Sequence, residues 1–223
     1  MTRVLECGRR AAQSGQADSL VVFLHGYGAD GNDLLGLADS FVPHLPNTVF
    51  VAPDAPEKSV TNPMGYQWFP IPWMDGSTQE QAEEGMARAV DDLNAFLDHV
   101  MAREGVSASQ TALLGFSQGT MMALHVAPRR GAEFAGVVGF SGRLVAPDML
   151  ADAVRVRPPV LLLHGDQDNV VPPEALPEAA QALQGAGINV YAHIMKGTGH
   201  GIAPDGLGVA LAFIRGRLGV KQG

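Results

Sequence analysis

The chain contains a serine in a setting that would make it a nucleophile. Residues 115–119 (GFSQG) match the pattern G-x-S-x-G, and they lie between a predicted strand at 111–114 and a predicted helix that ends at 127. Such a strand–turn–helix holds a serine on a sharp turn above a sheet, and the flanking glycines let strand and helix pass closely. The pattern is short, and an ordinary turn with a capping serine would share it. The assignment of Ser117 therefore depends on its partners.

A serine hydroxyl needs a base that takes its proton. Four histidines follow Ser117, and in this kind of site the acid and then the histidine come after the serine along the chain. His125 lies inside the predicted helix, and His164 and His193 lie in or at the end of predicted strands, where a histidine more often fills the core. His200 lies in KGTGHGI, a glycine-lined loop between the last strand and the last helix. We therefore predict that His200 is the base.

The acid that would orient this histidine should follow the preceding strand. The segment PPVLLLHGDQDNVVP offers Asp166 and Asp168, one of which would accept a hydrogen bond from the imidazole. Asp168 lies farther into the loop and has more reach, whereas Asp166 is closer to the strand and could brace the turn. The residues alone give Asp168 only a mild preference, and two solvated loop carboxylates are the alternative interpretation.

Backbone N–H groups could stabilise the oxyanion of a tetrahedral intermediate. One candidate is the N–H of Gln118, directly after the serine. The second would come from residues 25–28 (HGYG), which end an earlier predicted strand, with Tyr27 as the first candidate and Gly28 as the alternative. A plain glycine turn would have the same sequence.

The elements that must position these residues alternate between strand and helix. Helix 80–104 is the clearest, with capping-box spacing at Ser77 and Glu80 and with Gly105 at the position of a C-cap glycine. The alternation predicts an α/β fold with a mostly parallel central sheet and helices on both faces. Ligands bind such sheets beyond the carboxyl ends of the strands, where the candidate residues lie. Apolar patterning predicts strands at 19–25, 48–52, 111–114, 134–140, 159–164 and 188–195, and helices at 34–41, 80–104, 174–184 and 207–218.

Composition narrows the class of protein. The 223 residues suit a single domain over 1–223. Fifteen Lys and Arg against 23 Asp and Glu give a net charge of −8, so we expect no nucleic-acid partner. One cysteine, Cys7, excludes an internal disulfide framework, and without an H-E-x-x-H motif we expect no metal and no other cofactor.

The chain has no apolar run long enough to span a membrane and no secretory h-region. We therefore expect a cytoplasmic setting without stable membrane anchoring. A homodimer is left open.

Four ordered motifs carry a resemblance to a known family. LHGYGADGNDL, GFSQG, HGDQDNVVP and GTGHG together resemble the bacterial carboxylesterases of the phospholipase/carboxylesterase family, to which the eukaryotic acyl-protein thioesterases and lysophospholipases also belong. The resemblance covers almost the whole chain and implies an α/β-hydrolase fold. It also implies Ser117 as nucleophile, Asp168 as acid, His200 as base, and the N–H groups of Tyr27 and Gln118 as oxyanion donors. The resemblance thus favours Asp168 over Asp166 as the acid, a choice that the spacing of the residues left open.

The loop at 53–76 is the predicted wall of an acyl pocket. Segment 141–158 is too short for a cap domain, so we expect no large cap and a site covered by loops. Four apolar residues of the 53–76 loop are predicted to bind substrate: Met64, Trp68, Phe69 and Trp73. Packing of these side chains onto the core is the alternative. Many relatives carry W-F-D or W-Y-D here, whereas this chain has WFPIPWMD, so their acyl-chain preference transfers poorly.

These observations predict a serine carboxylesterase that hydrolyses small to medium carboxylic esters, as small-molecule substrates, through a covalent acyl-enzyme. Thioester or lysophospholipid hydrolysis would use the same chemistry on the same fold. A non-catalytic binding protein of this fold is the alternative from a different class, and the intact set of serine, acid and histidine argues against it.

Overall fold

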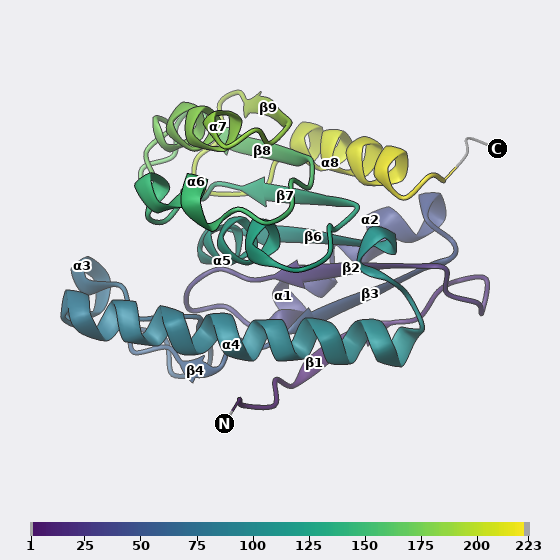
Figure 1. Ribbon diagram of the computed structural model, residues 1–223, viewed down its shortest axis with the longest axis horizontal. Helices are drawn as coiled ribbons and strands as arrows, with labels where there is room; N and C mark the ends of the chain where they lie inside the picture. Colours follow the sequence, from purple (N-terminus) through teal and green to yellow (C-terminus); the bar gives the residue numbers. More distant parts are fainter. Residues whose placement is uncertain (1, 221–223) are drawn as a thin grey trace.

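A seven-stranded sheet forms the centre of the molecule (Figure 1). The computed structural model describes residues 2–220, so residues 1 and 221–223, the ends of the predicted domain 1–223, lie outside the described part. The strand order is β1-β3-β2-β6-β7-β8-β9; β1 pairs antiparallel with β3, and all other pairs are parallel. The strands are β1 (Cys7–Arg10), β2 (Ser19–Leu24), β3 (Thr48–Pro53), β6 (Thr111–Phe116), β7 (Gly136–Phe140), β8 (Val160–Gly165) and β9 (Val190–Met195).

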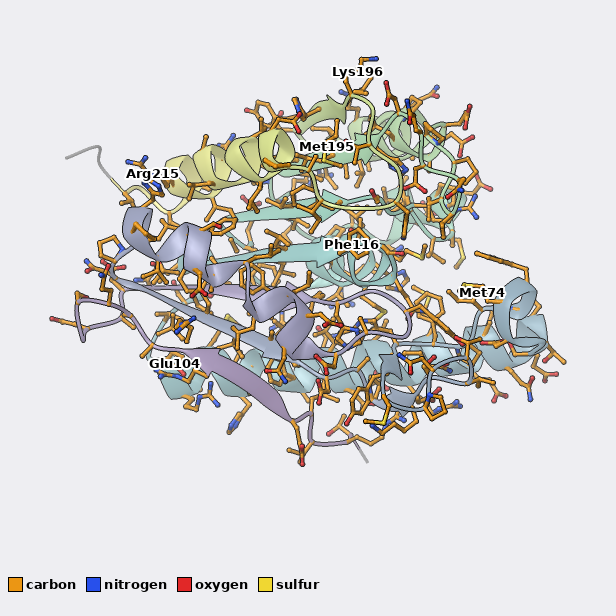
Figure 2. All side chains as sticks on the ribbon, turned by 180° about the vertical axis from the view of Figure 1, so that it is seen from behind. Met74, Glu104, Phe116, Met195, Lys196 and Arg215 are labelled. Atoms are coloured by element: carbon orange, nitrogen blue, oxygen red, sulfur yellow. The ribbon has the colours of Figure 1, made fainter. Side chains whose placement is uncertain are left out.

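Helices cover both faces of this sheet, as the alternation predicts. Apolar side chains of one sheet face pack with α4, α5 and α7, and those of the other face pack with α1, α2 and α8. Figure 2 views the second of these faces. Because β2, β3 and β6 are buried on both faces, their sequences are continuous apolar runs rather than alternating ones. The helices are α1 (Gly31–Leu35), α2 (Ala38–Phe41), α3 (Pro72–Asp75), α4 (Gln79–Glu104), α5 (Gln118–Val126), α6 (Leu150–Ala153), α7 (Ala175–Gly185) and α8 (Pro204–Arg217).

The strand order opens a crevice where the site is expected. The chain passes from β2 to β3 on one side, whereas β6 lies on the other side of β2. Connections that leave neighbouring strands in opposite directions create a crevice at their carboxyl ends, the usual ligand position in such sheets. The loop after β2 and the turn after β6 therefore lie side by side. Among residues 2–220 no large cap covers this edge, because residues 141–158 form only short helical turns that include α6.

Several predicted elements differ from the observed ones. The predicted helix 34–41 is two short helices: α1 begins earlier, after the Asp30 capping box, and the chain turns at Gly36 and Leu37 before α2. The capping box of α4 is Thr78–Gln81 rather than Ser77–Glu80, because both pairs have the required spacing and the N–H of Ser77 already donates to Asp75. Gly105 does end α4 in the left-handed conformation, with φ 69°.

The loop at 53–76 has more structure than its glycines and prolines predict. It contains a two-stranded ribbon, β4 (Glu57–Lys58) and β5 (Tyr66–Gln67), followed by α3. Figure 1 shows α3 and the first turns of α4 projecting beyond the carboxyl ends of the strands, and Met74 marks this projection in Figure 2. This projection forms one wall of the candidate site. Within residues 2–220, no helix combines the length and the apolar character that crossing a membrane requires.

Candidate active site

Ser117 occupies the strained turn between β6 and α5. Its backbone has φ 53° and ψ −114°, in a region that residues with a side chain rarely adopt. The N–H of Ser117 donates to the carbonyl oxygen of Phe140 at 2.9 Å, which ties the turn to β7. A Cβ at Gly115 would lie 2.5 Å from the backbone of Gly119, and one at Gly119 would overlap the carbonyl of Leu24. Only glycine therefore permits this close passage of strand and helix.

Ser117, His200 and Asp168 form one hydrogen-bonded line. His200 Nε2 lies 3.0 Å from Ser117 Oγ, and His200 Nδ1 lies 2.8 Å from Asp168 Oδ2. The carboxylate can only accept, so Nδ1 carries the proton and Nε2 faces the serine hydroxyl as an acceptor. The ring of Phe116 packs against the imidazole, with ring centroids 5.0 Å apart. The structure thus brings together three residues that lie up to 83 positions apart in the chain.

Asp168 is held from both sides of its carboxylate. Its Oδ1 accepts hydrogen bonds from the N–H groups of Val170 and Val171, each at 2.9 Å. Burial raises the pKa of Asp168, but the hydrogen bonds from His200, Val170 and Val171 outweigh burial, and the pKa lies below its usual value. The carboxylate therefore stays ionised beside the imidazole.

Asp166 does not contact the imidazole. Its carboxylate accepts from the N–H of Gly197 at 2.7 Å and lies 3.3 Å from Lys196 Nζ. Burial acts to raise the pKa of Asp166, but the hydrogen bonds from Gly197 and Lys196 lower it overall. Asp166 thus braces the loop after β9, one of the two roles that the sequence left open for it.

The loop after β2 presents its backbone toward the elbow. Within residues 2–220, the N–H groups of Tyr27 and Gln118 have no hydrogen-bond acceptor, whereas the N–H of Gly28 donates to the Tyr66 carbonyl at 2.8 Å. The alternative donor Gly28 is therefore already occupied. His25 fixes the start of the loop, because its Nδ1 lies 2.7 Å from the carbonyl of Gly26 and its Nε2 accepts from the N–H of Ala55.

Trp68, predicted to bind substrate, belongs to the core instead. Its side chain is fully buried, and its indole N–H donates to the carbonyl oxygen of His25 at 3.0 Å. The side chain of Gln118 accepts from the N–H of Trp68 at 2.9 Å and donates to the carbonyl of Phe69 at 2.7 Å. A buried indole N–H needs a hydrogen-bond acceptor, and here the acceptor, the carbonyl oxygen of His25, lies inside the molecule, so the ring points inward. Trp68 thus anchors the 53–76 loop to the elbow.

An apolar groove of about 380 Å³ lies beside the three aligned residues. Two of the predicted residues, Phe69 and Trp73, line it, and Trp73 is 67% exposed at its edge. Met64 does not line the groove; it is 83% exposed near the tip of the ribbon loop, where the turn points its side chain outward. The other lining residues come from five segments: Pro70, Ile71, Pro72, Gln79, Ala82, Glu83, Met86, Met121, Arg143, Val145, Val170, Val171 and Pro172.

Three hydrogen bonds join groove residues to Ser117 and Asp168, and a fourth joins Phe69 to Gln118, the residue after the serine. Met121 lies one helical turn after Ser117, and its N–H donates to the Ser117 carbonyl at 3.2 Å. Val170 and Val171 donate to Asp168, and Phe69 is bonded to Gln118. Met121 was not predicted from the sequence, although it follows the serine by four residues, about one turn into the predicted helix. The valines gave no separate signal, because an apolar loop segment also suits core packing.

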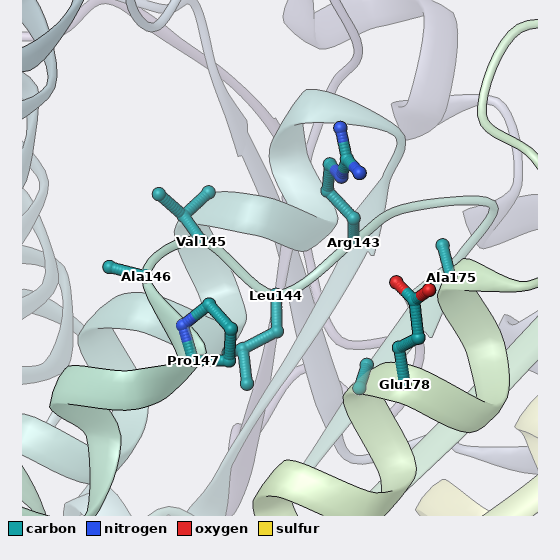
Figure 3. Close-up of a pocket in the computed structure, with 8 residues that line it drawn as sticks. Arg143, Leu144, Val145, Ala146, Pro147, Ala175 and Glu178 are labelled. Atoms are coloured by element: carbon teal, nitrogen blue, oxygen red, sulfur yellow. The ribbon is translucent and has the colours of Figure 1, made fainter.

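The segment after β7 separates this groove from a second hollow. Figure 3 shows that hollow, of about 340 Å³, with Arg143 and Glu178 on its walls. Arg143 and Val145 line both spaces, so the loop after β7 is their common border. Within residues 2–220, no three His, Cys, Asp or Glu side chains are arranged to hold a metal ion.

Comparison with known proteins identifies the family and the fold of the chain. Residues 6–218 match the phospholipase/carboxylesterase family model. The chain is 43% identical to the crystal structure of esterase PE8, with a TM-score of 0.91 over 97% of this chain and 100% of that one. It is 30% identical to esterase YpfH of Escherichia coli, over 89% of this chain and 83% of the relative. It is also 30% identical to acyl-protein thioesterase 1 of Saccharomyces cerevisiae, over 93% and 96% respectively. The chain therefore belongs to the phospholipase/carboxylesterase family of carboxylic ester hydrolases and has its α/β-hydrolase fold.

Proposed function

We propose that the chain is a serine carboxylesterase that cleaves small to medium carboxylic esters through a covalent acyl-enzyme. The observation that carries the proposal is the line from Asp168 through His200 to Ser117, at 2.8 and 3.0 Å. Ser117 Oγ attacks the ester carbonyl while His200 Nε2 takes its proton. Asp168 holds the imidazole in the required tautomer and stabilises the imidazolium that forms.

The oxyanion then lies near two unoccupied N–H groups. Those of Tyr27 and Gln118 are the proposed donors, and Gln118 is also the first residue of α5, whose N-terminus favours developing negative charge. The alcohol leaves with the proton from His200. Water then attacks the acyl-enzyme by the same steps, again with His200 as the base.

The apolar groove is the proposed acyl site. Its volume of about 380 Å³ lies at the small end of the range for ligand pockets, which suits short and medium acyl chains. The 53–76 loop supplies Phe69 and Trp73 to this wall. Relatives named acyl-protein thioesterase make the thioester the second candidate for the bond cleaved, and a matched pair of ester and thioester with the same acyl group separates the two.

A labelling experiment tests the nucleophile. A fluorophosphonate should modify the wild-type protein on the peptide that contains Ser117, and Ser117→Ala should abolish labelling. Ester turnover should fall by about 10⁴- to 10⁶-fold. Ser19→Ala is the control: Ser19 is buried at the start of β2 and bonds to Thr48, so this variant should label normally. Labelling of Ser117→Ala, or near-normal turnover, would reject the mechanism.

A chain-length panel tests the acyl site. Trp73→Ala should lower kcat/KM more for octanoyl than for butyryl or acetyl esters of one alcohol, because each buried methylene is worth about 0.8 kcal/mol. Trp68→Phe serves as the contrast: this side chain lies in the core, so the variant should lower all three values together. An equal response of all three esters to Trp73→Ala would move the acyl site out of this groove.

A further inference from the structure

His164 lies next to the acid of the proposed site, although the mechanism above does not use it. It is the fifth residue of β8 and is only 2% exposed. Its Nε2 is 2.9 Å from the carbonyl oxygen of Val171 and 3.3 Å from Asp168 Oδ2. Both neighbours are acceptors, so Nε2 carries a proton; it donates this proton to the Val171 carbonyl, and the N–H end of the ring lies against Asp168 Oδ2.

Asp168 thus has hydrogen-bond donors on both carboxylate oxygens, and His164 packs against one of them. Oδ1 accepts from the N–H groups of Val170 and Val171, whereas Oδ2 accepts from His200 Nδ1 and lies 3.3 Å from His164 Nε2. A carboxylate offers about four lone-pair positions, and three of them receive hydrogen bonds while His164 Nε2 lies beside the oxygen that has one bond. The torsion between Cβ and the carboxylate is soft, and donors on both oxygens are what fix it.

We propose that His164 is a positioning residue that holds Asp168 Oδ2 where His200 Nδ1 meets it. Its hydrogen bond to the carbonyl of Val171 closes the loop that also supplies the N–H donors to Oδ1, and its contact with Oδ2 limits where that oxygen can move. This inference rests on the proposed function, because positioning matters only where Asp168 is the catalytic acid. His164 itself does not touch Ser117 or the substrate groove.

Two amides of different reach give the test. In His164→Gln, the amide nitrogen is as many bonds from the backbone as Nε2 and can restore the donor, whereas in His164→Asn it is one bond shorter. We expect kcat for an acetyl ester to fall by about 10- to 100-fold in His164→Asn and His164→Leu, with KM changed by less than about threefold. His164→Gln should stay within about fivefold of wild type. Equal losses in all three variants, or none in any, would overturn the inference.

An Asp168→Asn background shows whether His164 acts through the acid. The fluorophosphonate labelling rate should fall with His164→Asn in the wild-type background and change by less than about threefold in the Asp168→Asn background. The same fold-loss in both backgrounds would mean a merely structural role. If Asp168→Asn alone keeps wild-type activity, the proposed triad fails; if it loses activity while His164→Asn does not, only this inference fails.

Discussion

His125 gives the fold a weakness at mildly acidic pH that can be calculated. It lies in the last turn of α5, and its Nδ1 is buried with no hydrogen-bond partner among the described residues. A helix C-terminus normally favours a cation, but here Arg129 already binds the His125 carbonyl at 2.8 Å. Burial, followed by repulsion from Arg129, lowers the pKa of His125 to about 4. The folded protein therefore keeps this imidazole neutral.

The sign follows from proton binding. The unfolded chain protonates this histidine below about pH 6.5, whereas the folded protein does so only near pH 4. Above pH 6.5 this histidine is neutral in both states, and the free energy of unfolding has its full value. As the pH drops from 6.5 toward 4, the unfolded chain binds a proton that the folded protein does not, so the free energy of unfolding falls. At pH 5 the full pKa difference would cost about 2 kcal/mol, and partial exposure of the side chain reduces this to about 1 kcal/mol. For a chain of this size, that is a fall in Tm of about 2–4 °C.

The assay compares variants at two pH values. Urea unfolding at pH 7.5 and pH 5.0 gives the free energy of unfolding lost by wild type and by His125→Leu. The variant should lose about 1 kcal/mol less, because its side chain does not titrate. His99→Leu, which changes an exposed histidine on α4, should lose as much as wild type. Equal losses in wild type and His125→Leu would refute the reasoning.

Three further changes test the elbow and the two carboxylates. Gly119→Ala should cost about 3 kcal/mol or more, because its Cβ would overlap the carbonyl of Leu24; an unchanged Tm in thermal unfolding would contradict the packing. Asp166→Asn should lower Tm slightly by loosening Gly197 and leave kcat unchanged, and a large loss of kcat would transfer the acid role to it. Because the pKa of Asp168 lies below its usual value of about 3.9, the acid limb of kcat/KM that Asp168→Asn removes should lie below about pH 4; removal of a limb above about pH 5 would contradict an ionised acid.

The relation of serine, acid and histidine could be predicted because it depends on chain order and strand ends. Parallel strands bring their carboxyl ends to one edge, so Ser117 after β6, Asp168 after β8 and His200 after β9 meet whatever the details of the loops. The choice between Asp166 and Asp168 depended on side-chain direction. In the structure the Asp168 carboxylate reaches His200 and the Asp166 carboxylate reaches Gly197, which supports the proposed role of Asp168.

The wall of the groove could not be predicted because it depends on tertiary partners. Trp68 and Trp73 are five residues apart in one loop, yet one is fully buried and the other is 67% exposed. The difference arises because the carbonyl of His25 and the side chain of Gln118, both distant in sequence, satisfy Trp68. The edge strand β1 was missed for a related reason: CGRR has no apolar run, and its arginines form ion pairs with α4 and α2.

Asp75, the acid of the WFPIPWMD segment, links the 53–76 wall of the groove to the loop after β2, which carries Tyr27. The carboxylate of Asp75 accepts from the N–H groups of Ile71 at 2.7 Å and Ser77 at 2.9 Å, which closes α3, and from the hydroxyl of Tyr27 at 3.2 Å. Burial raises the pKa of Asp75, but these hydrogen bonds outweigh it and keep the carboxylate ionised. Tyr27 is also a proposed oxyanion donor through its backbone. A substitution that moves α3 therefore moves the loop that carries this donor, so acyl-chain preference and turnover should change together in this chain.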